Sequence, residues 1–368
     1  MEIPNFVKTH FPESVIEDKK EVFSMYKHNG RTFVRMAHDL GHLLRGTVFW
    51  DKDMLYGYPR IRRILHLERG IDRYLREGFY AEEKMDGYNV RVKLVDGLLI
   101  AFTRGGFICP FTTERVSELL PARFFSVYPL HTLCGEVVGP ENPYNTEVIP
   151  YMKEDLMFMG FDIMDGKGRL ILPEEKYKVF EKEGINQVRH WGQFRDINIP
   201  QVKNLIIDLD RDEREGITLK PVAEGGKTLK YVTPSSCLRD IEATAGLLSE
   251  LPAGFYMERM IRLLFFCHEF GIEAGDYFKD VAKALSSQNQ KLLKELDEGG
   301  QVREFFSIRV RRKETVDALL LHLKTVGVRA HLMSMEAIGE YYKARFYRVF
   351  DRATKELRDR LRGHGFFD

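Results

Sequence analysis

The spacing of apolar and polar residues divides this 368-residue chain into stretches of different character. The first fifty-odd residues carry short apolar runs separated by turn signals, as in "YKHNGRTFVRMAHD". Such runs predict a small, mostly β module over residues 1–55. The next stretch, "PRIRRILHLERGIDRYLREGF", has apolar residues near helical spacing and predicts two helices divided at Gly70.

Strand signals dominate from Phe79 to about Thr233. The run "NVRVKLVDGLLIAFTR" alternates apolar and polar residues on both sides of Asp96-Gly97, which is a strong hairpin signal. "PEEKYKVFEKEG" begins with Pro and ends with Gly, so it predicts a surface helix. After Pro234 the spacing becomes helical, and we expect helices for the rest of the chain. The expected fold class is α+β: antiparallel sheets with helices, followed by an α-helical C-terminal region.

Composition and charge are those of an ordinary globular protein. Hydrophobic residues make up 44% and charged residues 30% of the chain, and the net charge is +1, so any nucleic acid would be held by local patches. The most apolar run, "MIRLLFFCHEFGI", is too short to span a bilayer, and the N-terminus lacks a signal pattern. The cysteines form no Cys-x-x-Cys pair, which argues against a zinc site and predicts buried thiols. We expect a cytoplasmic protein with no membrane partner.

The stretch "EEKMDGYNVRV" contains Lys84, a candidate nucleophile. Lys84 is expected at the end of a strand, beside a turn that contains Asp86-Gly87. Its amine can attack an electrophile once its pKa, about 10.4 in water, is lowered by burial or by nearby cations. Alone, Lys-x-Asp-Gly is a weak motif, and a solvated hairpin lysine is the competing interpretation.

Further residues suited to nucleotide binding follow Lys84 at strand-like positions. Cations can hold phosphates, carboxylates can hold ribose hydroxyls or a metal ion, and an aromatic ring can stack on a base. Each also has a plainer interpretation, because strand aromatics are often core and strand-end acids are often surface residues. The set comprises Arg104, Glu136, Phe161, Asp162, Glu215, Lys220 and Lys230.

This ordered series resembles the covalent nucleotidyltransferase superfamily of ATP-dependent ligases and mRNA capping enzymes. Lys84-Met85-Asp86-Gly87 is similar to motif I, and Gly135-Glu136 is similar to motif III. Phe161-Asp162 is similar to motif IIIa, Glu215-Gly216 to motif IV, and Lys230 to the second lysine of motif V. The resemblance implies an ATP-grasp-like nucleotidyltransferase core, with ATP and Mg²⁺ or Mn²⁺ as cofactors.

The resemblance also implies a role for each residue. Lys84 would take AMP from ATP. Glu82 would accept a hydrogen bond from the adenine amino group, and Phe161 would stack on adenine. Asn89 would lie against the sugar, and Arg104 would contact the ribose or the phosphate.

The remaining implied roles concern the metal ion and the α-phosphate. Glu136 would bind the ribose or help to hold a metal ion, and Glu215 would help to position the metal ion. Lys220 and Lys230 would surround the α-phosphate. Motif V normally reads Lys-x-Lys, but residue 228 is Thr here, so Lys220 is implied as the source of the missing charge.

The C-terminal third distinguishes among the members of the superfamily. DNA ligases and capping enzymes usually continue with an OB barrel and a basic motif VI, whereas helical spacing follows Thr233 here. This tail, Asn89 and the chain length are similar to the homodimeric ATP-dependent RNA ligases of archaea and some thermophilic bacteria. That family implies a lysyl-AMP intermediate, adenylation of an RNA 5′-phosphate and sealing to a 3′-hydroxyl, which joins or circularises single-stranded RNA. The alternatives are a DNA ligase, a GTP-dependent capping-type enzyme, or an inactive nucleic-acid-binding relative.

The same resemblance implies a homodimer and a division into segments. The apolar run at 257–270 suits a dimer interface, with a core helix as the equal alternative. The arginines of 60–76 and "RVRRK" at 309–313 suit nucleic-acid contact, although a solvated face is the favoured interpretation. The implied segments are an N-terminal module (1–55), a nucleotidyltransferase domain (56–235), a helical dimerisation domain (236–305) and a small C-terminal domain (306–368).

Overall fold

The computed structural model describes residues 3–145, 149–195, 197–223, 225–247, 250–252 and 254–365, without the side chains of 287 and 288. The chain forms two compact units, each built from several segments. Unit 1 comprises Met1–Arg60, Gly87–Val137 and Leu156–Gln187, and unit 2 comprises Ile61–Asp86, Val138–Asp155 and Val188–Asp368. The segment boundaries expected from the sequence stay a prediction.

Unit 1 begins with the expected β-rich module. Its sheet has the strand order β1-β2-β3-β4, and the turn between β1 and β2 has positive φ at Asn29 and Gly30, as a tight hairpin requires. Short helices precede it and cover the apolar cluster around Val34 and Phe49. The elements are α1 (Asn5–Lys8), α2 (Glu13–Asp18), η1 (Lys20–Val22), β1 (Phe23–His28), β2 (Arg31–Met36), β3 (Val48–Trp50) and β4 (Asp53–Leu55).

A second sheet of unit 1 has the order β10-β9-β7-β8. The predicted hairpin is confirmed, because β7 pairs with β8 around Asp96-Gly97, both at positive φ. Val90, Val92 and Leu133 pack against the covering helices. The elements are β7 (Tyr88–Val95), β8 (Leu98–Thr103), β9 (Thr132–Val138), β10 (Met157–Met164), α4 (Pro110–Leu119), α5 (Ala122–Val127) and α6 (Pro173–Glu183), the last being the predicted surface helix, which ends at Gly184.

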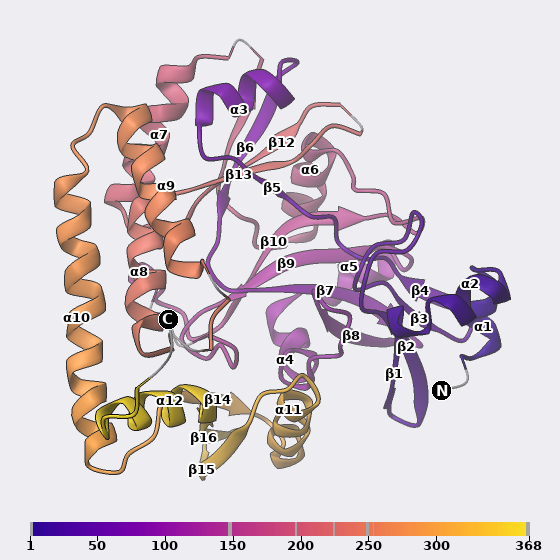
Figure 1. Ribbon diagram of the computed structural model, residues 1–368. Coiled ribbons are helices and arrows are strands. Elements are labelled where there is room, and N and C mark those ends of the chain that lie inside the picture. Colours follow the sequence, from indigo (N-terminus) through magenta and orange to yellow (C-terminus); the bar gives the residue numbers. More distant parts are fainter. Residues whose placement is uncertain are drawn as a thin grey trace. The chain divides into compact units, whose positions relative to one another are not determined.

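Unit 2 is built on a sheet with the order β11-β6-β12-β13-β5, antiparallel except between β13 and β5. Ala81, Ile217, Leu219 and Tyr231 give it one apolar face, which packs against the helices α3, α7 and α9 (Figure 1). The elements are β5 (Arg62–Arg63), β6 (Phe79–Lys84), β11 (His190–Phe194), β12 (Gly216–Pro221), β13 (Leu229–Val232), α3 (Leu67–Tyr74), α7 (Ile199–Arg211) and α9 (Phe255–Phe270).

The prediction of two helices divided at Gly70 is wrong. Gly70 lies buried inside the single helix α3, while Arg62 and Arg63 form the short strand β5. A Cβ atom on Gly70 would come within 2.7 Å of the Ile64 side chain. The glycine therefore allows the helix to approach the preceding segment closely, which sequence spacing does not reveal.

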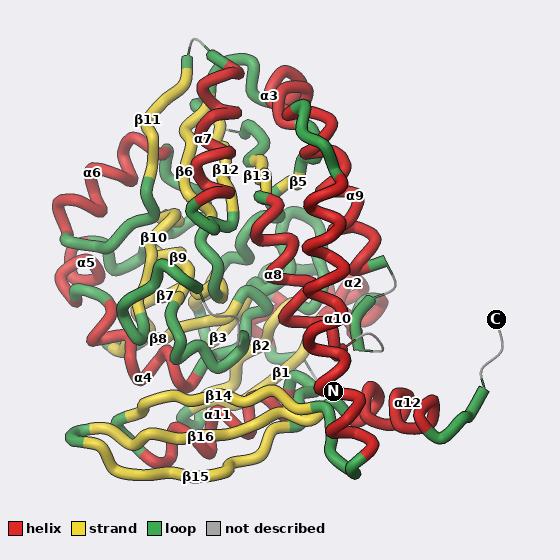
Figure 2. Tube along the Cα trace, turned by 90° about the vertical axis from the view of Figure 1, so that its left-hand side faces the viewer, coloured by secondary structure: helices red, strands yellow, loops and turns green. Residues whose placement is uncertain are grey.

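Helices dominate unit 2 after β13, as expected. The segments α8 (Pro234–Thr244), η2 (Ala245–Leu247), α9 and α10 (Gly275–Asp297) follow in order. Ile241, Leu263 and Val281 join α8, α9 and α10 in one apolar cluster, and the helices lie side by side in Figures 1 and 2.

The expectation of helices through to the C-terminus is wrong. A sheet with the order β14-β16-β15 follows α10 in the chain and is completed before the last helix begins; Figure 2 shows its three strands side by side. The alternation in "REFFSIRV" is a strand pattern, and Gly339, at positive φ, forms the turn from β15 to β16. The elements are β14 (Arg303–Val310), α11 (Lys313–Thr325), β15 (Ala330–Ile338), β16 (Tyr341–Val349) and α12 (Asp351–Leu361), so in this region the expectation of helix is confirmed only for α11 and α12.

The remaining general expectations concern thiols and membranes. Cys109, Cys134, Cys237 and Cys267 are buried free thiols, as predicted. Across the part of the chain that the structure describes, no helix has the length and apolar character needed to cross a membrane.

Candidate active site

The second face of the unit 2 sheet is polar and carries Lys84. In the register of the strands, Lys84 lies opposite Gly216, and Glu82 lies opposite Thr218, which in turn faces Lys230. Directly opposed residues share a face of a sheet, and residues two apart along a strand do so too. The strands therefore bring Glu82, Lys84 and Lys230 onto one face, together with Lys220.

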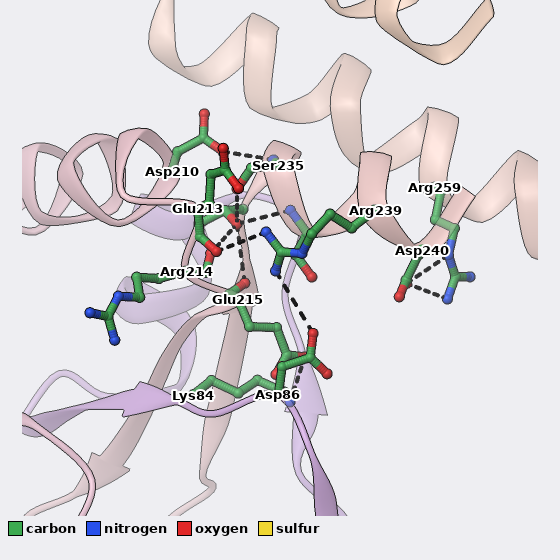
Figure 3. A network of polar contacts seen from close by, with 12 residues as sticks. Lys84, Asp86, Asp210, Glu213, Arg214, Glu215, Ser235, Arg239, Asp240 and Arg259 are labelled. Carbon is green, nitrogen blue, oxygen red and sulfur yellow. Dashed lines mark hydrogen bonds and ion pairs between the residues drawn. The ribbon is translucent and has the colours of Figure 1, made fainter. Parts of the chain in front are cut away.

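Lys84 forms a close ion pair with Glu215, which directly precedes β12. The Lys84 Nζ to Glu215 Oε2 distance is 2.6 Å, and both side chains are largely buried (Figure 3). Burial raises the pKa of Glu215 to about 7, with Asp86 and Asp240 adding to the rise and Lys84 opposing it. The nucleophile candidate thus contacts an acid that is poised to exchange a proton near neutral pH.

Asp86 extends this site toward α8. Burial raises its pKa and Asp240 adds to the rise, while Lys84 and Arg239 oppose it. Arg239 Nη2 lies 3.8 Å from Asp86 Oδ2, and Arg239 Nη1 donates to the backbone carbonyl of Glu213 at 2.7 Å (Figure 3). Sequence reasoning missed Arg239, because nothing in the helical pattern of α8 shows that this helix returns to Lys84.

Thr233 fixes the backbone beside Glu215. Its amide donates to the Glu215 carbonyl at 2.9 Å, and its hydroxyl donates to the Arg214 carbonyl at 2.6 Å. The same hydroxyl accepts from the Ser236 amide and caps α8. A Thr-Pro pair signals a helix start in the sequence, but its second role in holding Glu215 depends on the fold.

The two acids before Lys84 are held by other cations. Glu82 pairs with Lys220 at 2.8 Å, and both side chains are buried. Glu83 lies on the opposite face, where Arg214 contacts it at 2.9 Å and Arg189 at 3.2 Å. Lys84 has its close ion pair with Glu215, so these two preceding acids are not its salt-bridge partners.

The position of Lys220 disfavours the α-phosphate role that the resemblance implied. Lys220 is four residues along β12 from Gly216, the residue opposite Lys84, which is roughly 13 Å of strand. Lys230 is only two pairs away from the level of Lys84. Because Lys220 is paired with Glu82, it is better suited to orienting that carboxylate than to holding a phosphate beside Lys84.

Unit 1 carries the other predicted residues. Asn89 on β7 lies opposite Glu136 on β9, so these two polar side chains share a face of that sheet. Asn89 Oδ1 is buried with no hydrogen-bond partner among the described residues, which is costly unless a ligand supplies one. Phe161 is half-buried, with its ring centroid 5.4 Å from that of Tyr58, and Arg104 is exposed just after β8.

Asp162 is a structural residue in unit 1. It accepts a hydrogen bond from the Tyr58 hydroxyl at 2.5 Å and lies 3.7 Å from Lys176 Nζ. Lys176 also donates to the Phe161 carbonyl at 2.6 Å. These buried contacts hold the strand that presents Phe161.

The acids near Lys84 suit a metal ion that arrives with a nucleotide. In the described ranges, no cluster of His, Cys, Asp and Glu side chains has the three members needed to hold a metal ion by itself. Asp86 and Glu215 are buried acids with raised pKa values, and a divalent cation would stabilise their charged forms. Mg²⁺ typically takes one or two protein carboxylates and completes its shell with water and phosphate oxygens. This pair fits that pattern.

Two family models match the chain. The model described as RNA ligase matches residues 77–232, which include Lys84, Glu136, Glu215 and Lys230. The model described as the C-terminal region of ligase Pab1020 matches residues 243–364. Together they cover both the strands that carry the site and the sheet formed by β14–β16.

Known proteins are similar over nearly the whole chain. A structure of an Aquifex aeolicus protein, provisionally named an ATP-dependent DNA ligase, is 32% identical with a TM-score of 0.92, covering 97% of this chain and 100% of that one. An archaeal ATP-dependent RNA ligase is 27% identical with a TM-score of 0.92, covering 99% and 100%. An uncharacterised protein of Methanocaldococcus jannaschii is 27% identical, with 87% and 85% coverage. The chain therefore belongs to the RNA ligase family.

Proposed function

We propose that this protein is an ATP-dependent RNA ligase that carries AMP on Lys84 during the reaction. The observation that carries the proposal is the close pair of Lys84 with Glu215 at the edge of a polar sheet face, where Lys230 supplies a further cation. A buried lysine next to a proton-accepting carboxylate suits nucleophilic catalysis, since the amine must lose its proton before it attacks.

In the first step, Lys84 Nζ attacks the α-phosphate of ATP in line. A phosphorus–nitrogen bond forms, the bond to the bridging oxygen breaks, and pyrophosphate leaves. Glu215, 2.6 Å away and with a pKa of about 7, takes the proton from the amine. Lys230 stabilises the charge that develops on the phosphate oxygens.

In the later steps, lysyl-AMP serves as the activated covalent intermediate. The 5′-phosphate of an RNA strand attacks the AMP phosphorus and releases Lys84. A 3′-hydroxyl then attacks the activated 5′-phosphate and displaces AMP, which joins or circularises the RNA. Two activated transfers replace one difficult condensation, which is the advantage of a covalent intermediate.

The adenosine contacts follow the implied roles, except that Lys220 is proposed to position Glu82 and not to hold the α-phosphate. Glu82 binds the adenine amino group and Lys220 positions Glu82, as their 2.8 Å ion pair supports. Phe161 stacks on adenine, and Asn89 offers its unpartnered oxygen to a ribose hydroxyl. Arg104 and Glu136 are the further candidates for contact with the ribose.

A divalent cation, Mg²⁺ or Mn²⁺, is the proposed metal cofactor. Glu215 and Asp86 would hold it in unit 2, and Glu136 is the candidate in unit 1. When bound, it would neutralise phosphate charge. Glu215 must be ionised both for this contact and for accepting the proton of Lys84, so acidification would weaken both roles.

The experiment for the proposed function compares RNA with DNA. The protein is incubated with ATP, magnesium and a 5′-phosphorylated single-stranded RNA, a matched DNA strand, or nicked duplex DNA. We expect joined or circular RNA from the wild type and none from Lys84→Ala. Preferential sealing of nicked DNA would instead support the second candidate, a DNA ligase, which the 32% identity to the Aquifex aeolicus protein favours.

We also propose that the protein is cytoplasmic and forms a homodimer. The four segments expected from the sequence, 1–55, 56–235, 236–305 and 306–368, are proposed as its domains. Helix α9 buries Leu263 and Phe266 inside unit 2 but leaves other apolar residues exposed, which supports an interface along the helix. Light scattering behind a sizing column should give twice the chain mass, 86 kDa from 43.0 kDa per chain. A single-chain mass would contradict the dimer. The exposed apolar residues of α9 are Met257, Leu264 and Phe265.

A further inference from the structure

The C-terminal sheet of unit 2 has two different faces. In the register, Phe306 lies opposite Phe346 and Ile308 lies opposite Ala344, and all four side chains are buried. Helix α11 packs on the sheet and contacts β14 and β15. The alternate residues point the other way, because side chains alternate along a strand. We call this second set the outer face; it includes Phe305, Ser307 and Arg309 of β14 and Tyr347, Arg345 and Lys343 of β16.

A row of rings crosses the outer face from strand to strand. Phe305 of β14 lies opposite Tyr347 of β16, which lies opposite His331 of β15. The ring centroids of Phe305 and Tyr347 are 6.0 Å apart, and those of Tyr347 and His331 are 5.4 Å apart in a stacked arrangement. Phe305 is 58% exposed, and His331 is also exposed. Figure 2 shows how the three strands lie next to one another.

Cations are interleaved with these rings. Arg303 holds its guanidinium over the Tyr347 ring, 4.9 Å from the centroid. Arg345 and Lys343 lie on the same outer face of β16, and neither forms an ion pair with a residue that the structure describes. Acids also reach this face: Glu336 lies opposite Lys343, and Glu141 and Asp155 pair with Arg309, the β14 residue on the other side of Lys343. The centre of the face therefore combines exposed aromatic surface with an excess of positive charge.

We propose that this outer face is a binding platform for single-stranded RNA. Exposed rings on an open sheet stack with unpaired bases, and flanking cations hold the phosphates between them. Charge complementarity favours RNA over a protein occupant, since Arg303, Lys343 and Arg345 outnumber the acid that faces them, Glu336, and suit a polyanion. This inference rests on the proposed function. It assigns to the C-terminal sheet the task of holding the part of the substrate strand that does not react at Lys84.

The test measures RNA affinity with the full chain by fluorescence anisotropy. The probe is a labelled oligouridylate of roughly 12 nucleotides with a 5′-phosphate, in EDTA and without ATP so that no sealing occurs. Phe305→Ala should weaken binding at least about fivefold, the lower end of the cost of losing one stacked base. Leu98→Ala, which removes a side chain that is 60% exposed elsewhere, is the matched control and should leave affinity unchanged.

A second pair of variants tests the cations. Lys343→Gln with Arg345→Gln should lower the slope of log affinity against log salt by roughly 1.4, since each phosphate contact on a single strand contributes about 0.7. The control double variant, Lys294→Gln with Lys355→Gln, removes two exposed charges from α10 and α12 and should keep the wild-type slope. A double-stranded RNA probe should bind more weakly than the single strand, because its bases are already stacked.

The outcomes separate this inference from the proposed function. If the protein forms an AMP adduct with ATP and seals RNA, yet neither variant changes RNA affinity, the platform is refuted and the ligase assignment stands. If RNA binding depends on these residues but no adduct forms, the ligase assignment fails and the platform stands. Phe305→Ala that changes the oligomeric state and not RNA affinity would identify a second copy of the chain as the occupant, and the platform would be refuted.

Discussion

Replacing Glu215 with glutamine should change how the stability of the protein depends on pH. Glu215 is buried beside Asp86 and Asp240, and its pKa is raised from about 4.5 to about 7. The folded state therefore binds a proton at this site more tightly than the unfolded state does. Between pH 4.5 and 7 the folded protein holds more protons, so its free energy of unfolding falls as the pH rises through this window.

The size of the effect follows from the shift. A change of 2.5 pKa units corresponds to about 3 kcal/mol, of which about 2 to 3 kcal/mol develops between pH 5 and 8. Glu215→Gln removes the titrating group, and hence this decline. The loss of the contact with Lys84 lowers the whole stability curve of the variant, so the prediction concerns the dependence on pH and not the absolute stability.

Urea denaturation in EDTA at several pH values between 5 and 8 measures this dependence. The difference in unfolding free energy, variant minus wild type, should grow by about 2 to 3 kcal/mol across the range. Glu273→Gln, at an exposed position on the connection to α10, should show no such growth. A flat difference for Glu215→Gln, or one that shrinks as the pH rises, would refute the idea that Glu215 is held as a poised acid.

Further variants probe other parts of the chain. A Cβ on Gly135 would overlap the Phe158 ring, so Gly135→Ala should cost about 1 to 3 kcal/mol of stability in urea, whereas Gly275→Ala, with open space around it, should not destabilise. Burial lowers the pKa of His322 to about 4, so stability should fall by about 3 kcal/mol as the pH drops from 6.5 to 4, and His322→Gln should lose this dependence in acid titrations. Arg239→Gln should raise the pKa of Asp86 and shift the pH profile of AMP-adduct formation to higher pH, and Arg239→Lys should restore the profile. An unchanged profile would show that Arg239 does not act on the site.

The local chain signals were enough to predict much of the fold. The Asp96-Gly97 hairpin and the helix that ends at Gly184 were predicted correctly. In both, the apolar spacing and the turn residues give the same answer, and both signals depend only on residues close in sequence. The C-terminal sheet was missed because its strands stand between strong helical patterns. Gly70 was misread because the need for a glycine comes from Ile64, a tertiary contact.

The candidate site was predictable as a set of residues but not as a set of contacts. The ordered motifs were enough to expect Lys84, Glu82 and Lys230 in one site, and the strand register then places them on one sheet face. Nothing in the sequence shows that Glu215 is the ion-pair partner of Lys84, or that Arg239 reaches Asp86, since these contacts join segments more than a hundred residues apart. The phosphate role of Lys220 stays a prediction; its pairing with Glu82 and its distance along β12, neither visible in the sequence, favour a role in orienting Glu82.

The central claim is that Lys84 becomes covalently bonded to AMP. Intact-mass spectrometry of the protein after incubation with ATP and magnesium, followed by peptide mapping, tests it directly. The account predicts a gain of one AMP, carried by the peptide that contains Lys84, absent from Lys84→Ala and absent when GTP replaces ATP. An adduct that persists in Lys84→Ala, or no adduct on folded wild-type protein, would contradict the account.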